Sequence, residues 1–181
     1  MTNNDHGSFG DTGEVVFVRT LPGPIERVWE YLTDPAKRAL WLAGGSIDLR
    51  VGGQVHLEFH HDSLTPHEES VPEKYRELVR EGCGFTAVII RCEPPRLLSH
   101  TWGEADGSES EVTFELTPLG DQVRLVLMHR KLPEDRDNRI SVSAGWHIHV
   151  AILIAKLEDF VPPPFWETHT RLEDEYDCLI G

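Results

Sequence analysis

Three histidines are the residues of this sequence whose chemistry is easiest to connect to a site. His100 and His129 lie on two expected strands, each on the strand face that carries the apolar side chains. His149 lies at the edge of the apolar stripe of an expected helix. An imidazole is readily tuned to titrate near neutral pH, so a histidine that faces a cavity can orient or deprotonate a ligand. Each can equally be a hydrogen-bonded core histidine, and the sequence leaves both interpretations open.

A second group, His56, Glu58 and His60, has the composition of a metal site and shares one face of an expected strand. Residues i and i+4 of a strand lie about 13 Å apart, because each residue advances the strand by roughly 3.3 Å. Zinc holds its nitrogen ligands at about 2.0–2.1 Å, so these three side chains cannot share one ion. The spacing favours a solvated outer face, and we expect no metal and no cofactor.

Motifs for covalent catalysis and for phosphate binding are not found in the sequence. It contains no G-x-S-x-G nucleophile elbow, and no cysteine has an evident base beside it. The glycine pairs at 44–45 and 52–53 lack the G-K-S/T of a phosphate loop. Whether the chain is an enzyme stays open, with a binding protein favoured.

The elements that must position these side chains are predicted from periodicity and turn signals. Residues 14–20 alternate and are rich in β-branched side chains, which predicts a first strand. Pro24 begins a helix, and a second short helix runs through 38–42. From 47 to 131 the chain reads as strands separated by Gly- and Pro-containing turns, which predicts an antiparallel meander of six strands.

The longest helix is predicted over residues 140–160, before three consecutive prolines. Its apolar stripe contains Val142, Trp146, Val150, Leu153, Leu157 and Phe160. Such a stripe needs a concave partner, so we predict an α+β helix-grip fold, a curved antiparallel sheet wrapped around the long helix. The candidate ligand-binding residues are the ones turned into this interior: Phe59, His100, Trp102, Phe114, Leu127, His129, Trp146, His149, Val150 and Leu153.

Three segments fall outside this plan. Residues 1–13 are expected to be a flexible N-terminus, and 165–181 a helical extension that packs on the outside of the domain formed by 14–164. Residues 62–82 interrupt the meander and contain a short, highly charged helix. We expect a surface flap, either inert or closing over the cavity mouth, without which the domain still folds.

Ordered motifs between residues 15 and 160 narrow the fold to a family. They are Pro24-x4-Trp29-x3-Thr33-Asp34-Pro35-x5-Trp41, Asp48-Leu49-Arg50-x-Gly52-Gly53, Glu93-Pro94-Pro95-Arg96-Leu97, Val112-Thr113-Phe114-x-Leu116-x-Pro118, Arg124-Leu125-x-Leu127-x-His129 and Gly145-Trp146. Together they resemble the homologues of the activator of the Hsp-ninety ATPase, a branch of the START-like or SRPBCC superfamily. The resemblance implies a small-molecule binder or a protein-interaction module, with a link to the stress response. The additional domain with which the co-chaperones stimulate the ATPase has no counterpart in these motifs.

Charge and composition limit the partners. Asp and Glu number 31 against 17 Lys and Arg, so a nucleic acid would be repelled. No apolar run of about 20 residues or signal peptide is evident, and the odd number of cysteines does not indicate a disulfide framework, so we expect a cytoplasmic protein without a membrane segment.

The leading hypothesis is a binding domain for a small apolar or aromatic molecule. The alternatives are a co-chaperone-like interaction module, with a protein partner or a homodimer, and a cyclase- or lyase-like enzyme.

Overall fold

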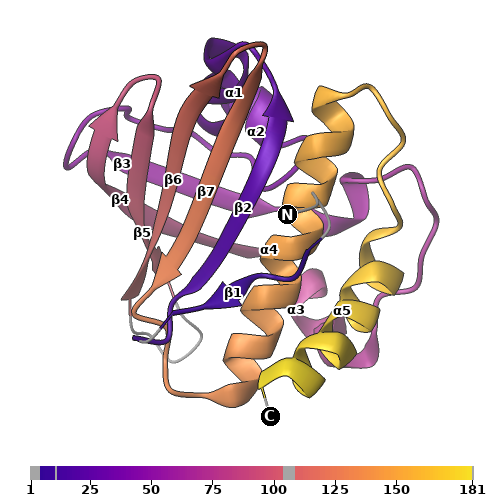
Figure 1. Ribbon diagram of the computed structural model, residues 1–181. Helices are drawn as coiled ribbons and strands as arrows, with labels where there is room; N and C mark the ends of the chain where they lie inside the picture. Colours follow the sequence, from indigo (N-terminus) through magenta and orange to yellow (C-terminus); the bar gives the residue numbers. More distant parts are fainter. Residues whose placement is uncertain (1–4, 11, 104–108, 181) are drawn as a thin grey trace.

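The computed structural model describes residues 5–10, 12–103 and 109–180. In these residues a curved antiparallel sheet with the strand order β1-β2-β7-β6-β5-β4-β3 wraps the long helix α4 (Figure 1). The strands are β1 Ser8–Phe9, β2 Val15–Pro22, β3 Gln54–Phe59, β4 Cys83–Glu93, β5 Leu97–Gly103, β6 Glu109–Leu119 and β7 Gln122–Arg130. The helices are α1 Ile25–Thr33, α2 Pro35–Arg38, α3 Arg76–Glu81, α4 Arg136–Leu157 and α5 Phe165–Ile180, with 3₁₀ turns η1 His61–Ser63 and η2 Glu73–Tyr75. The predicted helix-grip architecture is confirmed.

Alternation along the strands places the apolar side chains on the face predicted for them. Phe114 of β6 and Leu127 of β7 are cross-strand partners and both are buried, and the Phe114 ring contacts Trp146 of α4. The meander has five strands, β3 to β7, among the described residues, and not the six that we expected. The reason is that residues 44–53 form isolated bridges with β3, such as Ile47 with Val55, and no further strand.

Helix α4 supplies the centre of the core. Asp135 caps its first turn, since its carboxylate accepts a hydrogen bond from Asn138 N at 3.0 Å. The helix ends at Leu157, earlier than predicted, because the chain turns at Asp159 with a φ of 57°. Phe160 is therefore not part of the buried stripe and is 68% exposed, whereas Trp146 is only 3% exposed. The assignment of Trp146 to the inner face is thus correct, and that of Phe160 is wrong.

By length and composition α4 qualifies as a membrane-spanning helix, although we expected no such stretch. Of its most apolar window, 67% is buried inside the fold. Because the sheet and α5 already cover this surface, α4 has the burial of a core helix and not of a helix that faces lipid.

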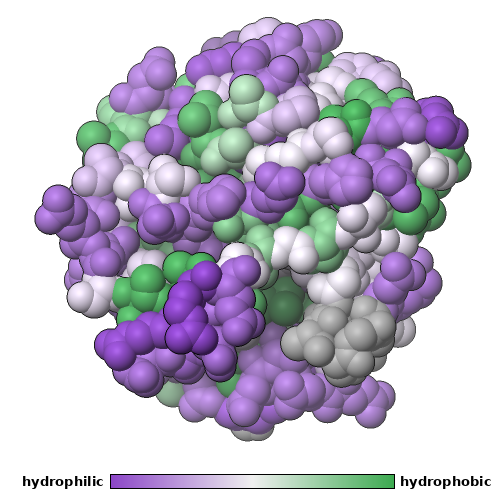
Figure 2. Space-filling model, turned by 180° about the vertical axis from the view of Figure 1, so that it is seen from behind, coloured by the Kyte–Doolittle hydropathy of each residue, from purple (hydrophilic) through white to green (hydrophobic). Residues whose placement is uncertain are grey.

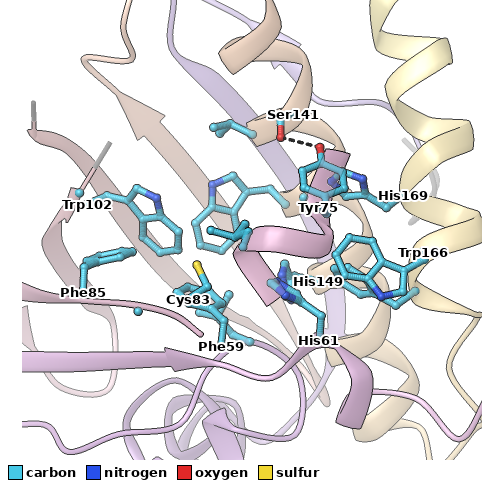
Figure 3. Close-up of a pocket in the computed structure, with 18 residues that line it drawn as sticks. Phe59, His61, Tyr75, Cys83, Phe85, Trp102, Ser141, His149, Trp166 and His169 are labelled. Carbon is cyan, nitrogen blue, oxygen red and sulfur yellow. Dashed lines mark hydrogen bonds between the residues drawn. The ribbon is translucent and has the colours of Figure 1, made fainter. Parts of the chain in front are cut away.

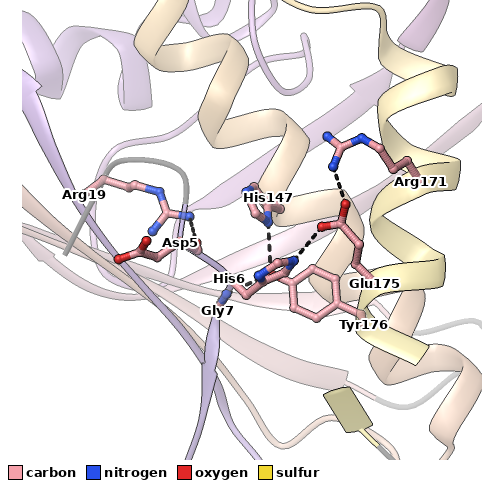
Figure 4. A network of polar contacts seen from close by, with 8 residues as sticks. All are labelled: Asp5, His6, Gly7, Arg19, His147, Arg171, Glu175 and Tyr176. Atoms are coloured by element: carbon pink, nitrogen blue, oxygen red, sulfur yellow. Dashed lines mark hydrogen bonds and ion pairs between the residues drawn. The ribbon is translucent and has the colours of Figure 1, made fainter. Parts of the chain in front are cut away.

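Helix α5 is tied to the N-terminal segment, which corrects two expectations (Figure 4). Residues 8 and 9 are not flexible but form β1, which pairs with β2. Tyr176 of α5 is buried, and its hydroxyl accepts a hydrogen bond from Gly7 N at 2.8 Å and lies 3.1 Å from Nδ1 of His147 on α4. His6 also contacts Glu175 at 2.6 Å. Helix α5 is therefore an integral layer of the domain and not an outer appendage.

Replacing Tyr176 by Phe should lower the free energy of unfolding by about 1–3 kcal/mol. The change removes the hydroxyl and leaves the buried Gly7 N–H and His147 Nδ1 without their shared partner. Urea denaturation measures the loss. Tyr31→Phe is the matched control, because the Tyr31 hydroxyl has no hydrogen-bond partner among the described residues, and equal midpoints for the two variants would contradict the role of Tyr176.

Candidate functional site

A pocket of about 440 Å³ lies where the strands β3, β4 and β5 meet the first half of α4 and the start of α5. Its walls are mainly aromatic, as Figure 3 shows. The lining residues are Leu42, Phe59, His61, Tyr75, Leu78, Cys83, Gly84, Phe85, Trp102, Gly103, Ser141, Val142, Gly145, Trp146, His149, Phe165, Trp166 and His169. Seen from behind, the molecule shows a hollow with a hydrophobic floor and a largely hydrophilic rim (Figure 2).

Four of the ten predicted site residues line this pocket: Phe59, Trp102, Trp146 and His149. The other six are buried in the core and are not among its lining residues: His100, Phe114, Leu127, His129, Val150 and Leu153. Parity and helical spacing showed which side chains face inward. They did not show which of these side chains pack into the core and which border the pocket.

His129 and His100 are hydrogen-bonded core histidines. Nδ1 of His129 accepts from Trp146 Nε1 at 2.9 Å, and its Nε2 lies 2.5 Å from Ser110 Oγ, so both ring nitrogens are occupied. His100 is buried and donates through Nδ1 to the Thr101 carbonyl at 2.7 Å. Burial lowers the pKa of His100 to about 4, which keeps this imidazole neutral at neutral pH. Neither side chain is in a position to anchor a ligand in the pocket.

Part of the pocket wall comes from α5 and from the insertion, both of which the sequence analysis placed at the periphery. Phe165, Trp166 and His169 lie on the first turns of α5, and Tyr75 ends η2. The signal was present for α5, where the apolar and aromatic residues from 165 to 176 recur at helical spacing. For Tyr75 the signal in the sequence was weaker, because the residue is a single aromatic within a charged segment.

The insertion is anchored to the domain at several points. Leu64 is 2% exposed, which means that it belongs to the core. Both oxygens of Glu69 accept hydrogen bonds from backbone amides at the start of α5, Phe165 N at 2.6 Å and Glu167 N at 2.8 Å. His67 donates through Nε2 to the Pro162 carbonyl at 3.0 Å. These contacts weigh against the expectation that the domain folds unchanged without residues 62–82.

Tyr75 joins the insertion to the rim of the pocket. Its ring stacks on Trp166 with centroids 5.3 Å apart, and its hydroxyl lies 2.5 Å from Glu173 Oε1 and 3.2 Å from Ser141 Oγ. The Tyr75 O–H donates to the Glu173 carboxylate, so the Ser141 hydroxyl donates to the Tyr75 oxygen. Burial raises the pKa of Tyr75, and the Glu173 carboxylate raises it further. The Tyr75 side chain therefore forms part of the pocket wall, and its protonated hydroxyl is hydrogen-bonded to both Glu173 and Ser141.

Glu173 is a buried carboxylate behind this wall. Burial opposes its ionisation, but the nearby His169, Lys74 and Tyr75 side chains stabilise the carboxylate, outweigh burial and lower its pKa to about 2. Lys74 Nζ lies 2.6 Å from Glu173 Oε2, and His169 Nδ1 lies 3.6 Å from the same oxygen. The rim of the pocket therefore holds a fixed anion next to an imidazole.

Two other imidazoles face the pocket and are neutral. Burial lowers the pKa of His149 to about 3 and that of His61 to about 4. His149 donates through Nδ1 to the Trp41 carbonyl at 2.7 Å, a bond that leaves Nε2 as an acceptor. The indole Nε1 of Trp166 is buried without a hydrogen-bond partner in the part of the chain that the structure describes. The site thus combines an apolar aromatic wall with a few convergent polar atoms.

The candidate metal group lies outside this pocket. His56 is on the outer face of β3, where its Nδ1 lies 2.9 Å from Thr86 Oγ1, and Glu58 and His60 are exposed. Within residues 5–10, 12–103 and 109–180 no three His, Cys, Asp or Glu side chains are grouped so that they could hold a metal ion.

Comparison with known proteins identifies relatives over nearly the whole chain. A family model described as "Activator of Hsp90 ATPase homolog 1-like protein" matches residues 22–158. The solution NMR structure of the protein encoded by gene BPP1335 of Bordetella parapertussis is 45% identical, with a TM-score of 0.80, and the match covers 98% of this chain and 92% of that one. No curated protein matches the sequence.

Two more distant structures show the same fold. CalU16 from Micromonospora echinospora is 21% identical, with a TM-score of 0.67 and coverage of 97% of this chain and 94% of that one. DynU16, a protein of the dynemicin biosynthetic locus, is 22% identical, with a TM-score of 0.62, and the match covers 84% of this chain and 49% of DynU16. At such identities the likeness concerns the fold alone.

Proposed function

Since the chain belongs to the family of activator of Hsp90 ATPase homolog 1-like proteins, we propose that it uses the helix-grip cavity to bind a small, uncharged aromatic molecule. The observation that carries this proposal is the pocket of about 440 Å³ between the sheet, α4 and α5, with its mainly aromatic walls. A volume of this order is typical of small-molecule sites, in which apolar walls supply affinity and a few polar groups fix orientation.

The charges around the pocket favour the entry of an uncharged molecule over that of a preformed aromatic anion. Glu173 is ionised behind Tyr75, and the chain carries a formal net charge of −14. His61 and His149 are neutral, so they offer no compensating positive charge. From the sequence we considered an imidazole that titrates near neutral pH, but the titration of His149 lies well below neutral pH.

The polar anchor that we propose is Nε2 of His149. The hydrogen bond of Nδ1 to the Trp41 carbonyl fixes the tautomer, and a neutral imidazole in this state accepts a hydrogen bond from a ligand hydroxyl or N–H. Apolar burial contributes about 25 cal/mol per Å², most of which the cost of association offsets, so we expect a Kd between about 10 µM and 1 mM.

Gly145 offers a direct test, because it lines the pocket from α4 and a Cβ built on it meets nothing within 4 Å. Gly145→Leu should fill the pocket and weaken the binding of 1-naphthol at least about tenfold, without unfolding the domain. Gly145→Ala is the matched control: it should bind 1-naphthol and be more stable by about 0.5–1 kcal/mol. Ligand-observed NMR measures binding, and urea denaturation measures stability.

Two results would count against the proposal. One is that wild type binds neither 1-naphthol nor other uncharged aromatics. The other is that Gly145→Leu binds them as well as Gly145→Ala does, which would place the ligand elsewhere.

The cytoplasm is the location that we propose for this activity. The three cysteines are all free thiols in the structure, and Cys83 and Cys92 are partly buried. Burial raises the pKa of both thiols, which keeps them in the less reactive protonated form. A reducing compartment suits three unpaired cysteines.

A further inference from the structure

We propose that His169 is the proton-accepting group of this pocket and that the bound aromatic carries, besides any donor held by His149, an acidic hydroxyl, a phenol or an enol, whose proton passes to His169 Nε2. This inference rests on the proposed function and names the chemical class of the ligand. It begins from a pocket-lining imidazole that is 5% exposed and whose Nδ1 has no hydrogen-bond partner in the described part of the chain.

The surroundings of His169 fix its ring and its tautomer. The ring stacks on Phe165, with centroids 5.9 Å apart and planes at 18°, and meets Tyr75 edge-on at 5.4 Å. Nδ1 points toward Glu173, one helical turn further along α5, at 3.6 Å from Oε2. A carboxylate at this position selects the tautomer with the proton on Nδ1 and leaves Nε2 as the basic nitrogen. We expect the Nδ1–Oε2 distance to shorten when a ligand binds, because hydrogen bonds of this kind are often long in ligand-free sites.

The charged and titratable groups that face His169 come from each neighbouring element. Glu173 is on its own helix, Tyr75 and Lys74 are on the insertion, and His61 and His149 are on η1 and α4. Tyr75 is protonated and engaged with Glu173, and Lys74 is paired with the same carboxylate. Burial lowers the pKa of His61 to about 4, although the Asp62 carboxylate acts in the opposite direction, and it lowers the pKa of His149 to about 3. His169 is the pocket imidazole with the ionised Glu173 carboxylate behind it, 3.6 Å from Nδ1.

The step is a simple proton transfer. The O–H bond of the ligand breaks, its electron pair stays on the oxygen, and an N–H bond forms at Nε2 of His169. The resulting imidazolium lies between the phenolate and the ionised Glu173, so the positive charge is compensated on both sides. No oxidant or cofactor takes part. A hydroxyl held in this way is activated for chemistry that begins from an enolate or a phenolate.

The probe is 4-nitrophenol, whose phenol and phenolate forms absorb at different wavelengths. At a pH below the pKa of free 4-nitrophenol, the full-length protein should produce the phenolate band on binding. His169→Gln should bind 4-nitrophenol about tenfold more weakly and without that band, and its affinity for nitrobenzene should not change. His56→Ala, which alters an imidazole outside the pocket, should behave like wild type.

A measurement on the wild-type protein keeps the test independent of the variants. The ring ¹⁵N shifts of His169 should move to those of an imidazolium when 4-nitrophenol is added, but not when nitrobenzene is added. The inference is overturned, and the proposed function kept, if nitrobenzene and 4-nitrophenol both bind while 4-nitrophenol stays protonated, or if His169→Gln retains the phenolate band. If neither compound binds, the proposed function fails and the inference fails with it.

Discussion

Lowering the pH from 7 to 5 should reduce the free energy of unfolding steeply and bring the domain toward acid unfolding. His100, His147 and His149 are all buried, and burial lowers their pKa values to about 4, 4 and 3. In the unfolded chain each has a pKa of about 6.5. Between these values the unfolded state binds more protons than the native state, so acid favours unfolding.

The pH window follows from these shifts. The stabilising contribution of each neutral histidine is fully present above about pH 6.5 and is lost as the pH falls toward about 4. Each fully shifted site adds a slope of up to about 1.4 kcal/mol per pH unit. Glu173, with its pKa lowered to about 2, acts in the same direction below about pH 4.5, where the unfolded carboxyl becomes protonated and the native one does not.

Urea midpoints at pH 7, 6 and 5 test this expectation. Replacing His147 by Gln removes one of these three imidazoles and should flatten the dependence, whereas His56→Ala on the outer face should leave the slope as it is in wild type. A midpoint that does not change between pH 7 and pH 5 would show that these histidines are not held neutral by the fold.

Replacing Trp146 by Ala should cost about 3–5 kcal/mol of stability. The indole is buried on α4 and packs against Trp102 and Phe114, with ring centroids 5.0 and 5.8 Å away. Its Nε1 also donates to His129 Nδ1 at 2.9 Å, so the truncation leaves a buried acceptor unpaired as well as a cavity.

The measurement is the shift of the urea midpoint of Trp146→Ala. Trp146→Phe is the informative comparison, because it keeps much of the ring contact and loses the hydrogen bond, and we expect it to lie between Ala and wild type. An unchanged midpoint for Trp146→Ala would mean that this face of α4 does not contact the sheet.

The fold was predictable because it depends on patterns that are local in the sequence. On β6 and β7 a period of two assigned Phe114 and Leu127 to the inner face, and on α4 a period of 3.6 did the same for Trp146. These periodicities decide which side chains are buried whatever the tertiary partner. The prediction that Phe160 is buried was wrong because a backbone turn at Asp159 ends the helical spacing, and periodicity does not reveal such a turn.

The pocket was less predictable because its walls come together only in the tertiary structure. His129 and His149 looked alike in sequence, each at an inward position of its element. They differ in the structure. Both ring nitrogens of His129 are engaged by Trp146 and Ser110, whereas His149 lines the pocket and uses Nδ1 for the Trp41 carbonyl, which leaves Nε2 as the acceptor. Tyr75 was missed because its partner Glu173 lies on α5, and the two meet only when the insertion packs there. His169 and Glu173 are four residues apart on one helix, a spacing that is visible in the sequence, but the sequence does not show that this face of α5 borders the pocket.

The hydrogen bonds of Glu69 make the insertion and α5 depend on each other, although the two segments are far apart in the chain. A change that shortens the C-terminus removes the amides of Phe165 and Glu167 and leaves the Glu69 carboxylate without them, and a change that removes the insertion leaves the first turn of α5 uncapped. Losing either segment alone leaves hydrogen-bonding groups of the other unpaired and lowers stability. Losing both segments together leaves neither set of groups unpaired and costs less stability. The family match ends at residue 158, before α5 begins. Among relatives of different length, the insertion and the last helix are therefore expected to be inherited as a pair.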